Sequence, residues 1–387
     1  MKTPLLLRNL LHDWTRTLVG IGGVAFAVVL MLVQLGFLNS VALTATLLYR
    51  RLDFDILLTS RQYQTVAKAG FFSRQRLYEA ASTPGVRDAR PLYLDFALWL
   101  TLDESVPREE RRRRGVLAIA FPLEQQPLTL RDLNERRERL KRAGVVFMDE
   151  LSKDKFGDWR HHPAAEINGR HMDIGGTFHL GTGFGPDGNV IMGDQTFRLL
   201  FPHRSLREVS LGLVRVAPGR DARQVCQELE RRLPKDVLAQ TRTEIQWREQ
   251  KYWILGMSIG IIFSFGVVVG FLVGAAIVYQ VLSSDIARHI AEYATLRAIG
   301  YSAGYLKRLV FKQALILATC GFMLGWLISA VLYRLTEKLH QIPMRMGVLD
   351  VPAALPLTVL ILTFAMCAGS GLLALRKINR ADPAALF

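Results

Sequence analysis

The stretch that decides the fold is TLVGIGGVAFAVVLMLVQLGFLNSVALTATLLY, residues 17–49, which contains no Asp, Glu, Lys or Arg. A second charge-free stretch, YWILGMSIGIIFSFGVVVGFLVGAAIVYQVLSS, occupies residues 252–284. The hydrocarbon core of a bilayer is about 30 Å thick, and about 20 apolar helical residues cross it. Each stretch is therefore predicted to span a membrane with residues to spare.

Two further apolar segments run from Gln313 to Tyr333 and from Val351 to Leu375. The mean hydropathy of +0.19 is high for a soluble protein and agrees with four spans. Residues 50–251 hold no comparable segment. The predicted fold class is an α-helical membrane protein with four transmembrane helices and a mixed α+β extracytoplasmic domain.

Basic residues flank the spans on one side. They precede the first span, fill the connection between the second and third, and follow the fourth. By the positive-inside rule these segments are cytoplasmic, so both termini are expected inside and residues 50–251 outside. The expected domains are residues 1–49, 50–251 and 252–387. The net charge of +15 is split almost equally between the cytoplasmic segments and the outer domain, which removes the basis for a nucleic-acid partner.

The first span is expected to stay as an uncleaved anchor, because its apolar run is too long for a secretory signal. Residues 4–17 place five large apolar side chains on one helical face and predict an amphipathic helix on the inner surface, with a disordered lead-in as the alternative. Both charge-free stretches exceed the bilayer thickness if helical throughout, so we expect two stalk helices that carry the outer domain. Thr243, with Gln246 three residues later, suggests a capping box before the second.

The outer domain carries local signals for both strands and helices. Asn168-Gly169 lies between AEI and RHMDI, a short hairpin signal. Gly185-Pro186-Asp187-Gly188 marks a turn before the strand-like NVIM. LGLVRV at 211–216 alternates as a strand, and apolar residues from Ala222 to Leu233 then recur at helical spacing.

Two clusters of ionisable residues in the outer domain are open to more than one reading. The arginine run Arg111–Arg114 and the charged run 131–142 fit a solvated surface, and alternatively a site for an anionic lipid head group or an acidic partner. Five histidines fall close together, at His161, His162, His171, His179 and His203. Their spacing matches no metal-ligand motif, so we expect surface or structural histidines and no metal site.

Two segments match a catalytic sequence motif but lie in the wrong structural context for it. Gly256–Gly260 and Gly300–Gly304 both read G-x-S-x-G, but that nucleophile motif needs a strand-to-helix turn, whereas the first lies in a span and the second in a short connection. The 387 residues contain no Gly-Lys pair, so they contain no P-loop. We expect no catalytic residue and no directly bound cofactor, and any ATP is expected to be used by a separate subunit.

The second span carries Gly266, Gly270 and Gly274 as GxxxGxxxG. Such spacing lets another helix approach closely, either within the chain or across a homodimer seam. The apolar runs of the four spans contain no Asp, Glu, Lys or Arg, which disfavours the proton relays and ion sites that secondary transporters use.

Three segments carry a family resemblance: EYATLRAIGYSAGYL at 292–306, RADPAALF at 380–387 and FHLGTGFGPDGNVIMGD at 178–194. The chain resembles a DevC-type ABC exporter permease, a branch of the MacB/FtsX superfamily, over nearly its whole length. The resemblance implies a homodimeric permease that binds a separate ABC ATPase, with a periplasmic adaptor (membrane fusion) protein and a TolC-like outer-membrane channel. It also implies a lipid-like or amphipathic cargo.

By the same resemblance, residues 285–306 contain a cytoplasmic coupling helix that docks on the ATPase. The expected contacts are Glu292, Thr295, Leu296, Arg297 and Gly300. A solvated connection between two spans is the alternative. Two other functions remain open within the superfamily: a lipoprotein-releasing permease, and an FtsX-like signalling regulator of an external hydrolase.

Overall fold

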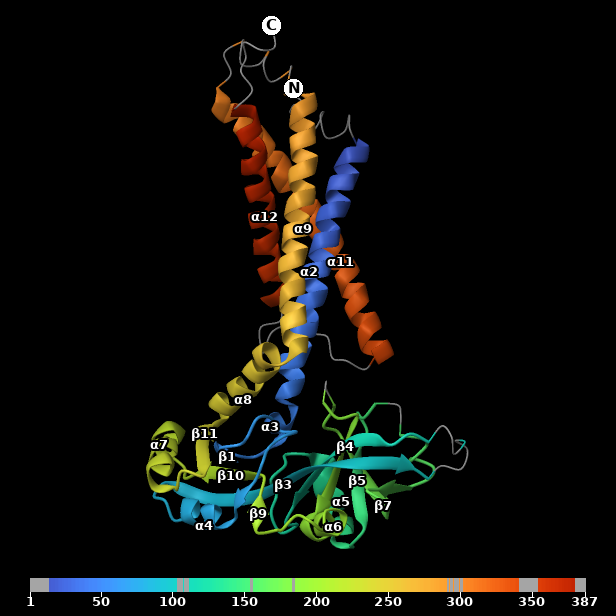
Figure 1. The fold of residues 1–387 in the computed structure, drawn as a ribbon, viewed down its shortest axis with the longest axis vertical. Coiled ribbons are helices and arrows are strands. Elements are labelled where there is room, and N and C mark those ends of the chain that lie inside the picture. The colour runs from blue at the N-terminus through green and yellow to red at the C-terminus, as the bar shows by residue number, and fades with distance from the viewer. Residues whose placement is uncertain are drawn as a thin grey trace. The chain divides into compact units, whose positions relative to one another are not determined.

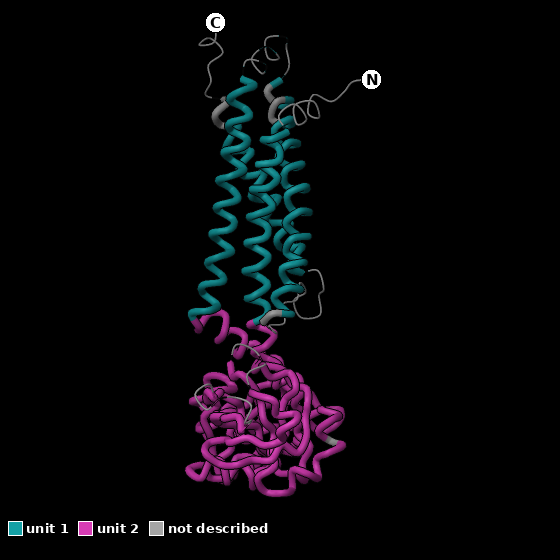
Figure 2. The backbone as a smooth tube through the Cα atoms, turned by 90° about the vertical axis from the view of Figure 1, so that its right-hand side faces the viewer, with its two compact units in different colours: residues 1–40, 258–387 teal, residues 41–257 magenta. Residues whose placement is uncertain are grey.

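The computed structural model describes residues 14–379 except 103–106, 108–110, 154–155, 183–184, 291, 293–294, 296–298, 300–301 and 341–353. The chain divides into two compact units, coloured separately in Figure 2. We call residues 1–40 with 258–387 the membrane unit, and residues 41–257 the inserted unit. The polypeptide passes between them at Ser40–Val41 and at Met257–Ser258.

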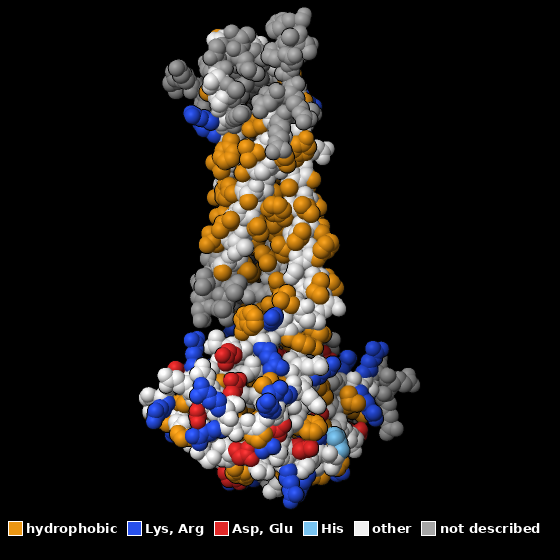
Figure 3. All heavy atoms as spheres, turned by 60° about the vertical axis from the view of Figure 1, so that its left-hand side comes forward, with side chains coloured by type: hydrophobic (Ala, Val, Ile, Leu, Met, Phe, Trp, Pro, Cys, Tyr) orange, Lys and Arg blue, Asp and Glu red, His pale blue; other side chains and the backbone are white. Residues whose placement is uncertain are grey.

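The membrane unit is built from helices long and apolar enough to cross a membrane (Figure 1). They are α2 Trp14–Ala45, α9 Ser258–Arg288, α11 Ala303–His340 and α12 Ala354–Asn379. Figure 3 shows that hydrophobic side chains cover the visible face of these helices, whereas Lys, Arg, Asp and Glu gather on the inserted unit. Four candidate spans with a mixed α and β domain confirm the predicted fold class. The predicted amphipathic helix at 4–17 falls almost wholly outside the described residues.

The core of the membrane unit lies between its helices. α12 packs against both α9 and α11, and buried side chains from all four helices form one apolar cluster. Two polar side chains satisfy backbone carbonyls inside it: Ser370 Oγ donates to the Ala275 carbonyl at 2.8 Å, and the Tyr333 hydroxyl donates to the Leu32 carbonyl. A hydroxyl in an apolar medium is costly unless it is hydrogen-bonded, so these bonds link helices as well as satisfying the groups.

The inserted unit is organised around a nine-stranded sheet with the order β11-β1-β10-β3-β4-β8-β5-β7-β6. Its strands are β1 Ile56–Ser60, β3 Val86–Thr101, β4 Arg114–Phe121, β5 Val145–Asp149, β6 Ala164–Ile167, β7 Arg170–Phe178, β8 Gly188–Gly193, β10 Leu211–Val216 and β11 Val237–Thr241. A small second sheet pairs β2 Phe72–Ser73 with β9 Glu208–Val209.

β3 belongs to two parts of the sheet at once. Its first half pairs with β10 as far as Leu92, and from Tyr93 onward it pairs with β4. Its last residues, from Trp99, also pair with β6. Strands β3, β4, β8, β5, β7 and β6 therefore form a closed ring, and β11, β1 and β10 extend from the other half of β3.

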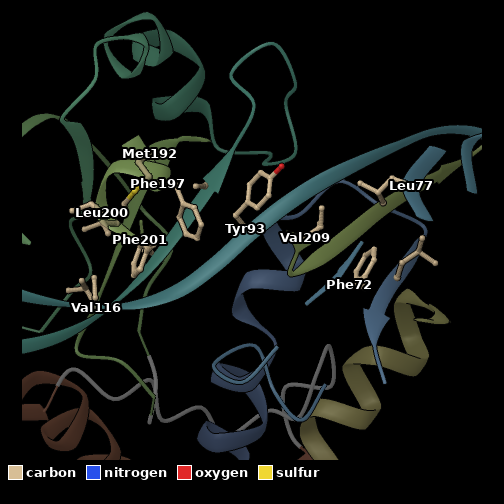
Figure 4. Packing of buried hydrophobic residues seen from close by; sticks show 14 of the residues in the cluster. Phe72, Leu77, Tyr93, Val116, Met192, Phe197, Leu200, Phe201 and Val209 are labelled. Atoms are coloured by element: carbon tan, nitrogen blue, oxygen red, sulfur yellow. The ribbon is translucent and has the colours of Figure 1, made fainter. Parts of the chain in front are cut away.

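The helices and turns of the inserted unit cover this sheet. They are α3 Leu47–Arg51, α4 Gln75–Ala81, α5 Arg131–Arg136, the 3-10 helix η1 Arg137–Lys141, α6 Asp194–Leu200, α7 Ala222–Arg232, α8 Arg242–Lys251 and the π-helix η2 Tyr252–Gly256. α4 packs on β3 and β10, α7 on β11, and α6 on β4 and β8. Figure 4 shows Phe197 and Leu200 of α6, with Phe201 directly after the helix, beside Val116 and Met192 of those two strands.

Several local sequence signals are confirmed. Asn168 (φ 50°) and Gly169 (φ 75°) form the two-residue turn between β6 and β7, where positive φ at both positions is the geometry of a type I′ hairpin. The strand at 211–216 and the helix from Ala222 are also as predicted, and bends at Gly185 and Asp187 precede β8, which begins at Gly188.

The capping box predicted at Thr243 and Gln246 is wrong by two residues. The Thr241 side chain accepts from the Glu244 amide, and the Glu244 carboxylate accepts from the Thr241 amide at 2.8 Å. Thr241 ends β11 with an extended backbone (φ −66°, ψ 160°), which is the conformation an N-cap needs, so the helix begins directly after the strand.

Neither charge-free stretch is one continuous helix. α2 ends at Ala45, Thr46 leaves the helical region with φ −106° and ψ 4°, and α3 begins at Leu47. In the second stretch the π-helix η2 is followed by Met257 in an extended conformation (φ −106°, ψ 141°), and α9 begins only at Ser258. Absence of charge identifies a span but does not report backbone breaks, which explains the difference.

Candidate functional site in the membrane unit

The predicted coupling segment lies between α9 and α11. Glu292 and Thr295 are helical and have exposed side chains, whereas Leu296, Arg297 and Gly300 lie outside the described residues. Ile299 is 71 % exposed, and its amide donates to the Thr295 carbonyl at 3.0 Å. Glu292, Thr295 and Ile299 are therefore accessible in this part of the chain.

The end of α9 that leads into this segment is held by polar contacts. Asp285 accepts from Gln313 Nε2 of α11 at 3.0 Å, and the His289 ring lies 3.6 Å from the other Asp285 oxygen. Arg16 of α2 donates to Ser284 Oγ at 2.6 Å. These bonds join α2, α9 and α11 beside the coupling segment. Sequence reasoning missed them, although Asp285 is visible as the acid that ends the second charge-free stretch.

The three glycines of the GxxxGxxxG motif face other helices of the same chain. A Cβ built on Gly266 would lie 2.5 Å from the Gln34 side chain, and one on Gly270 would lie 3.2 Å from Leu30 and Met31. At Gly274 it would meet Ala27 at 2.6 Å and the Met366 sulfur at 2.4 Å. The motif thus lets α2 and α12 approach α9 closely.

Two glycines of α11 approach α2 in the same manner. A Cβ on Gly321 would lie 2.5 Å from Val24, and one on Gly325 would lie 2.7 Å from Val28. α2 is therefore packed between α9 and α11, and Val24 and Val28 are fully buried. Without a side chain, each glycine shortens the distance between two helix backbones, which increases van der Waals contact in a setting where lipid supplies no hydrophobic driving force.

Two histidines of the inserted unit pair with carboxylates in the described part of the chain. His179 lies between Asp132 (2.8 Å) and Glu150 (3.1 Å), and the hydrogen bond to Asp132 raises the pKa of its imidazole. His161 pairs only with Asp158 at 2.6 Å. Among the described residues no group of three or more His, Cys, Asp or Glu side chains is arranged to hold a metal ion.

Comparison with known proteins gives one family match. Residues 264–383 match the family model described as FtsX-like permease C-terminal. No curated protein matches the sequence.

Solved structures with a weak likeness include one extracellular domain and one periplasmic region. One is the extracellular domain of the noncanonic ABC-type transporter YknZ from Gram-positive bacteria, at 9 % identity and TM-score 0.34, covering 49 % of this chain and 99 % of that one. The other is the periplasmic region of MacB from Actinobacillus actinomycetemcomitans, at 10 % identity and TM-score 0.35, covering 51 % and 92 %. At TM-scores below 0.5 neither likeness assigns a function.

The family match covers most of α9, the predicted coupling segment, and all of α11 and α12. It includes both GxxxG-spaced glycine pairs of α9 and the contacts around Asp285. The C-terminal part of the membrane unit is accordingly similar to the FtsX-like permease family.

Proposed function

We propose that the chain is the permease subunit of an ATP-driven exporter, which transmits the motion of a separate ATPase to the inserted unit. The observation that carries the proposal is the FtsX-like match over residues 264–383, which enclose an exposed segment between two candidate spans. Because the 387 residues contain no P-loop, ATP hydrolysis is assigned to the partner, and the chain is a non-catalytic subunit.

The exposed segment is the proposed ATPase contact. Glu292, Thr295 and Ile299 offer one acidic, one hydroxyl and one apolar side chain, all three exposed. The contacts of Asp285 with α11 and of Ser284 with α2 would pass a displacement of this segment into the helix bundle. Motion would then reach the inserted unit through the chain at Ser40–Val41 and Met257–Ser258.

The orientation follows the basic flanks, with the coupling segment in the cytoplasm and the inserted unit in the periplasm of a bacterial inner membrane. The lack of charged residues in the apolar runs favours transport without an ion pathway through the helices. A lipid-like or amphipathic cargo, a periplasmic adaptor and a TolC-like outer-membrane channel complete the proposed exporter, with two copies of the permease. Both glycine rows of α9 and α11 pack within one chain, so a dimer seam would have to use another face.

The test is affinity purification of the tagged chain from cross-linked native membranes. We expect an ABC ATPase together with an adaptor and an outer-membrane channel. Recovery of the ATPase with a lipoprotein and no channel would instead indicate lipoprotein release, and recovery with a cell-wall hydrolase would indicate a signalling regulator. Purification without any ATPase would contradict all three functions.

A further inference from the structure

Glu249 of α8 is a buried carboxyl group, with 1 % of its surface exposed. One of its oxygens accepts from the Tyr63 hydroxyl at 2.6 Å and from the Tyr49 hydroxyl at 3.3 Å. The other accepts from the Val66 amide at 3.2 Å and from Trp253 Nε1 at 3.3 Å. The two tyrosine hydroxyls are also hydrogen-bonded to each other.

These donors come from segments that are far apart in sequence. Tyr49 lies in α3, directly after the first crossing between the units, and Trp253 lies in η2, directly before the second. Tyr63 and Val66 lie in the loop that follows β1. One carboxyl group therefore connects both ends of the inserted unit to its sheet.

The opposite end of α8 is held to α3 by a different residue. The Arg242 guanidinium donates to the carbonyls of Tyr49 (2.7 Å), Leu52 (2.9 Å) and Phe54 (3.1 Å). Arg242 keeps its charge at any physiological pH, so these three bonds do not titrate. α8 is thus fixed to α3 at its first residue by Arg242, and near its last residue by Glu249.

Burial raises the pKa of Glu249 from 4.5 to about 7, although its four donors act in the opposite direction. Burial also raises the pKa of Tyr49 and Tyr63, so both hydroxyls stay neutral donors. Arg248 lies one residue before Glu249 on the same helix, but its guanidinium donates to the Tyr63 carbonyl at 2.7 Å and to Gln240 at 2.8 Å.

A cavity of about 80 Å³ adjoins the carboxyl group. Its walls are mainly apolar, and its lining includes Leu47, Leu48, Leu117 and Trp253 together with Glu249 and Asn189. Asn189 Nδ2 donates to the buried carboxylate of Asp149 at 2.8 Å, and burial raises the pKa of that group too. One buried water needs roughly 10–15 Å³, so the cavity has room for several.

We propose that Glu249 is a proton-controlled latch, which in its neutral form holds the C-terminal end of α8 against α3 and in its ionised form admits water and releases that end. Only the consequence of the latch rests on the proposed function. That consequence is control of how firmly the two crossings are joined when the ATPase moves the helices of the membrane unit. The geometry of the latch does not depend on what the protein exports.

The direction of the switch follows from the cost of a buried charge. A neutral carboxyl can donate to one tyrosine hydroxyl and accept the other three bonds, and it buries no charge. The ionised group can only accept, so the two tyrosine hydroxyls have two protons for the three contacts that join them to each other and to the carboxylate. The effective penalty for burying an ion is in addition several kcal/mol. Water entering the adjacent cavity relieves that penalty. It also weakens the bonds from Tyr49 and Trp253, which at 3.3 Å each are the longest of the four.

The first test follows Trp253 in the full-length protein in lipid nanodiscs, as the difference in fluorescence between the native chain and Trp253→Phe. We expect the emission to shift to longer wavelength as pH rises from 5.5 to 8.5, with a midpoint near the Glu249 pKa of about 7. In Glu249→Gln the shift is expected to disappear. The control is Glu228→Gln on α7, a partly exposed glutamate that pairs with Arg232, and it should leave the shift unchanged.

The second test measures opening. Spin labels on cysteines at Arg50 and Lys251, both exposed, report the distance from α3 to the last residue of α8. A matched pair at Arg50 and Thr243 reports the end held by Arg242. We expect the first distance distribution to broaden as pH rises through 7 and the second to stay constant, and Glu249→Gln should abolish the broadening.

A native protein whose fluorescence and distances do not change between pH 5.5 and 8.5 would overturn the proposal, whether or not the variants fold. Equal changes in Glu249→Gln would also overturn it, because some other group would then titrate. If Glu249→Gln fails to fold, Tyr63→Phe removes the shortest donor, which favours the ionised carboxylate, and is therefore expected to raise the midpoint of opening. Neither measurement requires the ATPase, so failure of the latch and failure of the proposed function are distinguishable.

Discussion

Gly274 of α9 and Ala27 of α2 lie so close together that a Cβ built on Gly274 would stand 2.6 Å from the Cβ of Ala27. The same atom would also stand 2.4 Å from the Met366 sulfur of α12. Three helices of the membrane unit therefore meet at a position that accepts only glycine, and substitutions there test the packing directly.

Gly274→Ala should destabilise the membrane unit. Overpacking a tight core costs about 1–3 kcal/mol, so we expect a lower thermal midpoint and a lower yield of folded protein in detergent. The matched control is Gly369→Ala in α12, where a Cβ would meet nothing within 4 Å. An unchanged thermal midpoint for Gly274→Ala would show that α2, α9 and α12 do not pack as described.

Cysteine labelling in intact cells tests the orientation. In a background in which Cys226, Cys320 and Cys367 are replaced, a membrane-impermeant reagent should label a cysteine at Arg112 and miss one at Ser302. Both positions are exposed, so access to each depends on the side of the membrane. The reverse labelling pattern would invert the proposed topology.

Ile299→Asp should weaken docking of the ATPase. Burying a side chain of this size is worth roughly 1.5–3 kcal/mol, and every ~1.4 kcal/mol changes affinity about tenfold. We expect about tenfold to a hundredfold less ATPase to copurify, at normal permease abundance. Leu296→Asp, which lies outside the described residues, is predicted to act likewise. Ser302→Asp adds the same charge nearby without removing an apolar contact, and serves as control. Normal export in Ile299→Asp cells would move the docking surface elsewhere.

The stability of the protein should fall as pH rises through the range set by Glu249. Its pKa is raised from 4.5 in the unfolded chain to about 7 in the folded state, so the folded state binds the proton more tightly between these values. The associated stability, about 3 kcal/mol, is fully present below pH 4.5 and is lost above pH 7.

Thermal unfolding of the native chain and of Glu249→Gln, measured at pH 5 and pH 8, isolates this contribution. The variant should gain stability relative to the native chain at the higher pH. Asp149 and Asp194, whose pKa values burial also raises, affect both proteins equally and cancel in the comparison. A constant difference between the two proteins across this range would contradict the shifted pKa.

The purified chain should hydrolyse no ATP by itself, since its 387 residues contain no phosphate-binding Gly-Lys loop. The measurement is phosphate release by the chain in nanodiscs before and after addition of the copurified ATPase. Activity that survives complete removal of that partner would refute the assignment of the chain as a non-catalytic subunit.

Much of the architecture was predictable because its causes are local. A charge-free apolar run of more than 20 residues identifies a span whatever surrounds it, since the bilayer itself selects for it. The Asn168-Gly169 turn and the helix from Ala222 were also readable, because φ preference and apolar spacing act within a few residues. These signals define the elements of both units but do not order the strands of the sheet.

What only the tertiary structure decided are relationships between residues far apart in the chain. The capping threonine is Thr241 because β11 ends there, and the helix break at Met257 follows no residue signal. Sequence alone shows Glu249 as one of several charged residues on a polar helix. Its role depends on Tyr49, two hundred positions earlier, and on Tyr63, because folding buries all three together. Burial removes the water that would otherwise keep the pKa of the carboxyl group near its usual value.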